Sequence, residues 1–183
     1  QLIGKVQGVI EDVGRITMDL HPSVLDDLGI GPTIDWFCRE SSANYANVRF
    51  EHEVDIREAE IAPRVKTAIF RIIQESFNNA VAHGQASHVT LSLKDNRGHV
   101  ELSVADNGIG FDPTQLRSAD AVGRGVGLVS MRERAEATAG RFRLESRSGH
   151  GTTVRVTWPK HCPRVDRAAS EATSLTAVST GQA

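Results

Sequence analysis

The sequence predicts an α+β fold, a two-layer sandwich in which helices cover one face of a mixed β-sheet, with a helical segment before it. Residues 88–95 and 99–106 each alternate apolar with polar residues, as strands with one buried face do. The three residues between them, Asn-Arg-Gly, favour a tight hairpin. Pro63 suits the first position of a long helix that continues to about His83.

The remaining elements extend this pattern in chain order. Residues 48–54 alternate as a strand before the long helix, and residues 127–138 predict a second helix after a glycine-rich stretch. Residues 141–148 and 152–158 predict a final hairpin. Strands in this order with few helices are typical of a sheet covered on one face. Residues 161–183 are rich in Ser, Thr and Ala, so we expect a disordered tail.

The N-terminal segment has a heptad pattern. Apolar residues recur at spacings of 4, 3, 4, 3 and 4, namely at Leu2, Val6, Val9, Val13, Ile16 and Leu20. This is the seam of a helix that packs on a partner helix, and the alternative is an amphipathic helix that lies on its own domain. His21 precedes Pro22, which disfavours helical geometry at His21 and predicts a break there.

A short linking region follows the break. Gly29, Gly31 and Pro32 predict a turn, and residues 33–41 predict another helix. The composition then changes to that of a loop. We therefore expect a boundary between a helical segment, residues 1–44, and a compact domain, residues 45–160.

Composition limits the classes of function. The formal net charge of −2 gives no general attraction to nucleic acid or to membranes, so direct contact with either is not expected. No apolar run approaches the ~20 residues of a membrane-spanning helix. The chain begins at Gln1 without methionine, so we expect a piece of a longer protein, which could itself be membrane-anchored. Cys38 and Cys162 match no metal-binding spacing and are typical of reduced thiols in the cytoplasm.

Two stretches place polar groups beside buried surface. Glu75, Asn79 and His83 follow one another at i, i+4 and i+8 along the border of the long helix's apolar face, which Ile69, Ile73, Phe77 and Ala80 form. An exposed helix margin is the alternative interpretation. Asp106 ends a predicted strand and is followed at once by Asn-Gly-Ile-Gly. This stretch fits either a plain turn or the floor of a pocket.

Four motifs in sequence order favour the pocket. They are QESFNNAVAHG (74–84), DNGIGF (106–111), GRGVGLVSMRERA (123–135) and GTTVRV (151–156). They resemble the N, G1 and G2 boxes and the terminal Gly-Thr of the GHKL (Bergerat) ATP-binding fold of histidine kinases, gyrase-like topoisomerases, Hsp90-type chaperones and mismatch-repair ATPases. DLHPSVLDDLGI and GLVSMRERA look specifically like two-component sensor histidine kinases that pair with LuxR-type response regulators. The resemblance covers about residues 16–158.

The resemblance implies roles for individual residues. Asn79 would be the protein ligand of Mg²⁺, a hard ion that takes oxygen ligands. Asp106 would accept a hydrogen bond from the adenine amine, with the Thr152 hydroxyl beside it. Glu75 would orient or polarise the reacting group. The glycines would let the backbone approach the base and the phosphates. The other implied ATP-binding residues are His83, Gly108, Gly110, Arg124, Gly125, Val126, Gly127 and Leu128.

Two features depart from the family pattern. Lysine often precedes the position of His83, and this sequence has Ala82 there, so Arg124 or His83 would supply the charge. The phosphoacceptor, a histidine followed by an acidic residue on a first helix, is also missing before His21, and His52-Glu53 lies in a predicted strand. The sequence therefore resembles a kinase that retains its second dimerisation helix and its catalytic domain.

Several functions stay open. The first is the catalytic part of a homodimeric sensor histidine kinase, which passes the γ-phosphoryl group of ATP to a histidine upstream and then to an aspartate of a response regulator. The second is an ATPase clamp of the gyrase or chaperone type, with Glu75 activating water. The third is a non-catalytic ATP-sensing or dimerisation module, and a fourth is a serine kinase that regulates a sigma factor.

Overall fold

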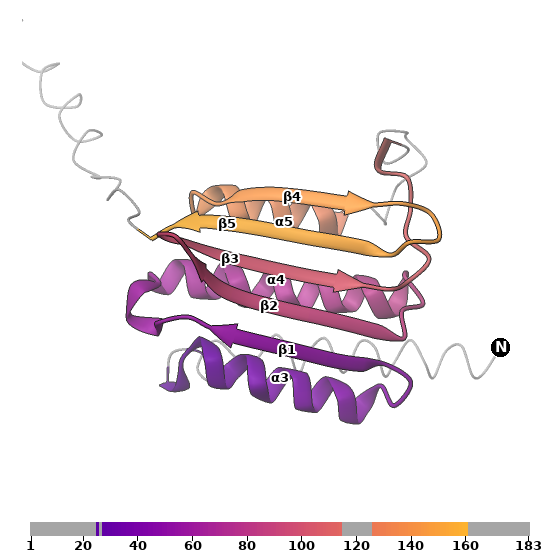
Figure 1. The fold of residues 1–183 in the computed structure, drawn as a ribbon, viewed down its shortest axis with the longest axis horizontal. Helices are drawn as coiled ribbons and strands as arrows, with labels where there is room; N and C mark the ends of the chain where they lie inside the picture. The colour runs from indigo at the N-terminus through magenta and orange to yellow at the C-terminus, as the bar shows by residue number, and fades with distance from the viewer. Residues whose placement is uncertain (1–24, 26, 115–125, 161–183) are drawn as a thin grey trace, which may run out of the picture.

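A five-stranded mixed sheet forms the centre of the molecule (Figure 1). The computed structural model describes residues 25, 27–114 and 126–160. The strands are β1 (Arg49–Asp55), β2 (His88–Asn96), β3 (His99–Asp106), β4 (Arg141–Ser146) and β5 (Thr152–Pro159). They lie in the order β1-β2-β3-β5-β4, with β1 and β2 parallel and the other neighbours antiparallel. Both predicted hairpins are therefore confirmed.

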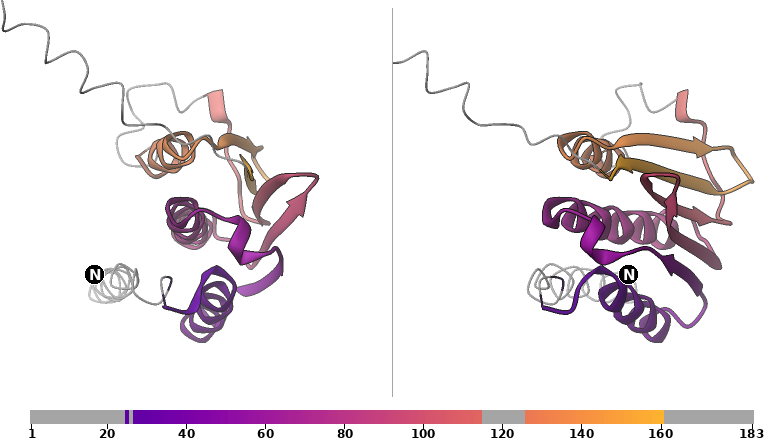
Figure 2. Two further views of the ribbon diagram at one scale, coloured as in Figure 1. Left: turned by 90° about the vertical axis from the view of Figure 1, so that its left-hand side faces the viewer. Right: turned by 60° about the vertical axis from the view of Figure 1, so that its left-hand side comes forward.

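The helices form the second layer. They are α3 (Ile30–Asn44), α4 (Pro63–Ala82) and α5 (Val126–Ala137), with a single 3₁₀ turn, η1 (Glu58–Glu60), between β1 and α4. Figure 2 shows α4 and α5 on one face of the sheet and α3 beside β1. The predicted fold class, an α+β sandwich with helices on one face of a mixed sheet, is confirmed. None of the helices within the described ranges has both the length and the apolar character needed to cross a membrane.

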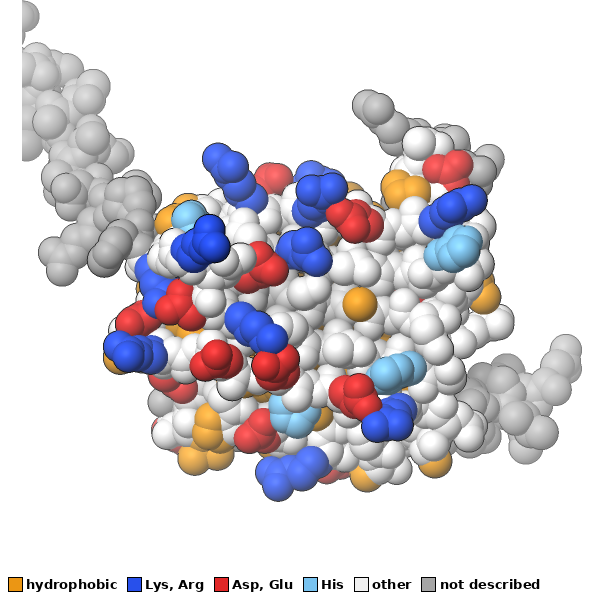
Figure 3. Space-filling model, viewed as in Figure 1, with side chains coloured by type: hydrophobic (Ala, Val, Ile, Leu, Met, Phe, Trp, Pro, Cys, Tyr) orange, Lys and Arg blue, Asp and Glu red, His pale blue; other side chains and the backbone are white. Residues whose placement is uncertain are grey.

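The alternation of buried and exposed side chains along the strands explains which face of the sheet the helices cover. In β2, Val89, Leu91 and Leu93 are fully buried, while the residues between them are partly or fully exposed. The opposite face of the sheet is polar, and Figure 3 shows acidic and basic side chains interspersed on it. One pair there is Lys94–Glu53, at 2.6 Å. Exposed pairs of this kind contribute little to stability, so burial of the other face holds the layers together.

Helix α4 follows the prediction closely. It begins at Pro63, whose missing N–H costs nothing in the first turn, and His83 caps its C-terminus. Ile69, Ile73 and Phe77 are at most 1% exposed. The predicted apolar face is therefore the face that packs on the sheet.

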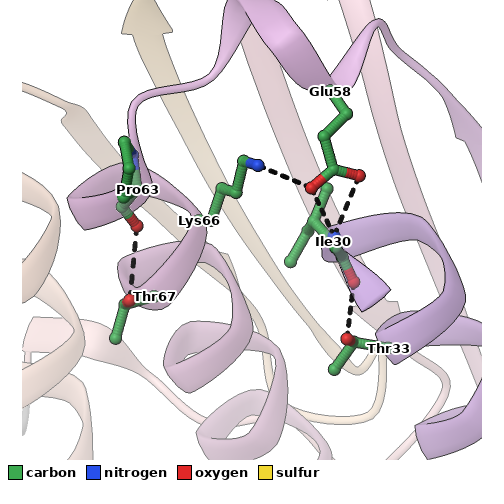
Figure 4. Close-up of polar contacts among 7 residues, drawn as sticks. Ile30, Thr33, Glu58, Pro63, Lys66 and Thr67 are labelled. Atoms are coloured by element: carbon green, nitrogen blue, oxygen red, sulfur yellow. Dashed lines mark hydrogen bonds and ion pairs between the residues drawn. The ribbon is translucent and has the colours of Figure 1, made fainter. Parts of the chain in front are cut away.

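Helix α3 begins earlier than the sequence indicates. The predicted turn is present at Gly29, with φ of +86°, but Gly31 and Pro32 lie inside the helix. Both oxygens of the Glu58 carboxylate accept a hydrogen bond from the Ile30 N–H, with N···O distances of 3.0 and 3.1 Å. The same carboxylate forms an ion pair with Lys66 (Figure 4). Pro32 is tolerated because the first-turn N–H groups have no partner within the helix.

Aromatic side chains join α3 to the sheet domain. Phe37, fully buried, makes edge-to-face contacts with Phe50 of β1 and with Phe70 and Phe77 of α4, at ring-centre distances of 5.7–5.9 Å. Helix α3 thus belongs to the same hydrophobic core as α4 and the strands. The division of the chain at residue 44 stays a prediction, because the heptad segment and the proposed tail lie outside the described residues.

Candidate nucleotide site

Three polar side chains lie in a row where β3, β5 and β4 meet. Asp106, the last residue of β3, pairs with Thr152, the first residue of β5, and Thr152 pairs with Ser146, the last residue of β4. Side chains alternate along a strand, so this row is on the face that also carries Val104 and Val154, the buried, helix-covered face. The polar row therefore continues the core face beyond its apolar part.

Asp106 is a half-buried carboxylate. Its Oδ1 accepts a hydrogen bond from the Gly108 N–H at 2.8 Å. Burial raises the pKa of the Asp106 carboxyl, against smaller lowering effects of hydrogen bonds from the backbone N–H groups of Gly108 and Thr152. Among the described residues, no Lys, Arg or His forms an ion pair with it. Asp106 thus presents an acceptor that no cation within the described part of the chain neutralises.

The glycines after Asp106 allow close packing of backbone on backbone. A Cβ on Gly108 would lie 2.3 Å from the carbonyl oxygen of Gly84, and a Cβ on Gly110 would lie 2.1 Å from that of Arg147. The Ile109 N–H donates to the same Gly84 carbonyl at 2.8 Å. The chain's own packing is therefore sufficient reason for both glycines, and their predicted approach to a base stays a prediction.

Asn107 fastens the same loop to β2. Its Oδ1 accepts hydrogen bonds from the N–H groups of Ser87 and His88, at 3.0 and 2.9 Å. Its Nδ2 donates to the Ser87 hydroxyl at 3.0 Å. Asn107 thus serves as a structural anchor that holds Asp106 in place.

Glu75 and Asn79 meet the start of α5. The Asn79 Nδ2 donates to Glu75 Oε1 at 3.3 Å. A Cβ on Gly127 would lie 1.9 Å from that carboxylate oxygen and 3.3 Å from Asn79 Nδ2. The structure thus brings together three of the predicted residues from two helices. The Asn79 amide nitrogen is thus turned to Glu75, and its predicted role as a ligand of Mg²⁺ stays a prediction.

The other predicted residues lie around these groups. His83 is exposed at the C-terminus of α4. The backbone carbonyl of Asn79 accepts hydrogen bonds from the N–H groups of His83 and Gly84. Val126 is exposed, whereas Leu128 is half-buried against the core. The backbone link from Gly84 to Ile109 connects this end of α4 to the loop after Asp106. Arg124 and Gly125 lie outside the described residues.

Sequence reasoning missed Ser146. Its Oγ accepts a hydrogen bond from the Phe111 N–H, donates to the Gly151 carbonyl and contacts the Thr152 hydroxyl, each at 3.0 Å. The predicted hairpin, with strands 141–148 and 152–158, would pair Ser148 with Thr152, whereas β4 ends at Ser146 and Ser146 itself pairs with Thr152. The sequence therefore held no signal for Ser146. Gly84 and Asn107 were inside the quoted motifs, but their contacts depend on segments distant in the sequence.

Comparison with protein families identifies the class. Residues 64–161, more than half of the chain, match the family of histidine kinase-, DNA gyrase B- and HSP90-like ATPases. The chain belongs to this family, as the order of its motifs indicated. Its nucleotide is therefore ATP.

Among individual proteins, the chain is similar to sensor histidine kinases. It is 30% identical over 156 residues to the oxygen sensor histidine kinase NreB of Staphylococcus carnosus, covering 85% of this chain and 44% of that protein. It is 33% identical over 171 residues to the sensor histidine kinase MctS of Rhizobium johnstonii, covering 91% and 36%. The chain thus spans less than half the length of these curated relatives.

Solved structures support the fold. The histidine kinase domain of an Erythrobacter litoralis blue-light activated histidine kinase aligns with a TM-score of 0.59 at 15% identity, covering 71% of this chain and 64% of that one. ShkA in complex with AMPPNP aligns with a TM-score of 0.53 at 20% identity, covering 69% and 30%. At these identities the likeness concerns the fold alone.

Proposed function

We propose that this chain is the catalytic part of a two-component sensor histidine kinase. It binds Mg-ATP and transfers the γ-phosphoryl group to a histidine outside the chain, with release of ADP. The observation that carries the proposal is the position of Asp106, a half-buried carboxylate without an ion pair in the described chain, beside Thr152 at the strand ends. The names of the similar proteins, NreB and MctS among them, support the kinase class.

Asp106 selects the base. Its carboxylate can only accept hydrogen bonds when ionised, and the adenine amine is a donor. Guanine has a carbonyl at the same ring position, which would place two acceptors against each other. Since an unpaired buried polar group is costly, the site favours adenine.

Asn79 and the start of α5 serve the phosphate end. The Asn79 oxygen fits a hard cation, and Mg²⁺ would neutralise charge on the phosphates. The first N–H groups of the 12-residue helix α5 have no acceptor within the helix, so they can donate to phosphate oxygens. Gly127 lets this helix start approach Asn79. Glu75, held beside Asn79, orients the reacting group, and His83 or Arg124 supplies the charge that Ala82 lacks.

The wider partners are part of the proposal. The heptad segment forms a homodimer in the full-length protein. A LuxR-type response regulator receives the phosphoryl group on an aspartate, and the reaction takes place in the cytoplasm. The charge of the chain supports no direct contact with nucleic acid or membrane.

Asp106→Asn tests the base-binding role. The change offers an amide donor to the adenine amine, so we expect calorimetry to show an ATP affinity loss on the order of 1–3 kcal/mol. Asp112→Asn is the matched control, because Asp112 is an exposed acid of the same loop whose side chain bonds Thr114. Unchanged ATP affinity in a folded Asp106→Asn variant would remove Asp106 from the site.

Asn79→Ala tests the cation role separately. We expect this variant to lose the part of ATP affinity that depends on Mg²⁺ and to keep the affinity measured in excess chelator. An equal loss with and without Mg²⁺ would show that Asn79 does not act through the cation.

A further inference from the structure

Ser146 connects the segments that meet at Asp106 and Thr152, where β3 ends and β5 begins. It is the last residue of β4, half-buried, and its hydroxyl contacts three groups at 3.0 Å each: the Phe111 N–H, the Gly151 carbonyl and the Thr152 hydroxyl. Phe111 belongs to the loop after Asp106, and Thr152 pairs with Asp106 across the sheet. One hydroxyl thus joins the loop, the hairpin and the residue next to the carboxylate.

The chemistry of the three partners assigns every hydrogen. A serine hydroxyl has one hydrogen and two lone pairs. The Gly151 carbonyl can only accept, so it takes the Ser146 hydrogen. The Phe111 N–H can only donate, so it occupies one lone pair. The Thr152 hydroxyl must then donate its own hydrogen to the second lone pair.

This assignment determines what Thr152 offers to a ligand. Its only hydroxyl hydrogen is directed to Ser146, so the Thr152 oxygen is left with lone pairs. Directly paired strand residues have Cβ atoms about 5 Å apart, so the side chains of Thr152 and Asp106 are neighbours on one face of the sheet. The strand ends therefore present two acceptors next to each other.

We propose that Ser146 is a positioning residue that sets the base selectivity of this site by keeping the Thr152 hydroxyl an acceptor. The inference rests on the proposed function and extends it to a residue outside the nucleotide contacts. A purine with an amino group at C6 has two hydrogens at that position to offer to two acceptors, whereas a purine with a carbonyl at C6 has none there and carries its ring hydrogen on N1. The site rejects the carbonyl through Thr152 as well as through Asp106.

Ser146→Ala should relax this selectivity. Without the Ser146 oxygen, the Thr152 hydroxyl is free to rotate and can donate to a C6 carbonyl. We expect the ratio of ITP to ATP dissociation constants to fall roughly tenfold. Purine riboside triphosphate, which has only hydrogen at C6, should bind within about twofold of its original affinity. Calorimetric competition on the whole chain with Mg²⁺ measures all three.

Matched variants separate positioning from structural damage. Ser146→Thr keeps the hydroxyl and should restore the original ratio, and Ser148→Ala, in the exposed turn of the same hairpin, should leave it unchanged. Ser146→Cys introduces a thiol, which has a similar shape but forms weaker hydrogen bonds, so it should lower the ratio less than Ser146→Ala does. It also gives a second test if the alanine variant unfolds. Loss of affinity for all three nucleotides by one factor, or an unchanged ratio, would overturn the role of Ser146. Failure of the unaltered chain to bind ATP would instead overturn the proposed function itself.

Discussion

At the scale of single residues, Asp106 combines half burial with a hydrogen bond from the Gly108 N–H. Burial disfavours its charged form and raises its pKa, whereas donation from an adenine amine would favour the charged form. If Asp106 binds adenine as proposed, binding and proton release at this carboxyl are coupled. The affinity for ATP should therefore depend on pH, in a range where an exposed carboxylate, which is protonated only in stronger acid, would show no change.

We predict that ATP affinity falls on acidification, beginning above the usual pKa range of an aspartate. The sign follows from the raised pKa: protonation of Asp106 is easier in the free protein than in the complex, so lowering the pH opposes binding. Titrations from about pH 7 to about pH 4 test this, with Asp106→Asn at each pH to subtract the nucleotide's own ionisation. Parallel pH profiles for the two proteins would contradict it.

Gly127 is the second residue at which the structure predicts the effect of a substitution. A methyl group there would lie 1.9 Å from Glu75 Oε1, so Gly127→Ala must displace either the carboxylate or the start of α5. We predict a roughly tenfold loss of ATP affinity, the size of one good hydrogen bond. Gly31→Ala, with nothing within 4 Å of the added carbon, is the matched control.

The collision itself can be tested by a double variant. Glu75→Ala with Gly127→Ala removes the carboxylate that the methyl group would strike. The combined loss of affinity should be smaller than the sum of the two single losses. Strictly additive losses would mean that the two residues act independently.

At the scale of elements, α3 is held by burial and by a cap. Phe37 packs among three phenylalanine rings, and the Glu58 carboxylate binds the Ile30 N–H at the helix N-terminus. Cys38, next to Phe37, is buried, and burial with the nearby Asp35 raises the pKa of its thiol to about 12. The thiol is therefore a reporter of whether α3 stays packed.

We predict that Phe37→Ala lowers the free energy of unfolding by about 3–5 kcal/mol, the cost of a large cavity in a packed core. Leu28→Ala, at a residue 60% exposed, should change it by less than about 0.5 kcal/mol. In a Cys162→Ser background, Cys38 should resist alkylation at neutral pH and react faster once Phe37 is removed. Rapid alkylation of Cys38 in the otherwise unaltered protein would contradict the packing of α3.

At the scale of the whole molecule, the predicted functions differ in where the phosphoryl group goes. A kinase part needs an acceptor imidazole with an adjacent carboxylate base, and His21 is followed by Pro22. A clamp ATPase transfers the phosphoryl group to water and needs no acceptor imidazole. The fate of the γ-phosphoryl group therefore distinguishes the classes.

We predict that the chain binds ATP but does not label itself from γ-labelled ATP. A separate helix that carries His followed by Asp or Glu should become labelled when it is added, with an acid-labile bond to its histidine. The same helix with the histidine changed to alanine is the control. Acid-labile phosphate on His21, or release of inorganic phosphate with no transfer to the helix, would count against the kinase assignment.

The sequence by itself determined the elements whose signals are local or periodic. The alternation in residues 88–106, Pro63 at the start of α4 and the order of the four motifs were sufficient to predict the sheet, the long helix and the ATPase family. The contact between Glu75 and Asn79 could be predicted because the helical period places them one turn apart. Such signals are read within one segment and need no knowledge of its neighbours.

Tertiary structure decided whatever depends on pairs of distant segments. Pro32 lies within α3, although prolines and glycines nearby predicted a turn, because Glu58, 28 residues after Ile30, caps the helix. The position of Ser146 beside Thr152, and so near Asp106, became known only from the register of β4, β5 and β3. The physical reason is that hydrogen bonds and burial act over a few ångströms in space, whereas sequence patterns report only neighbours along the chain.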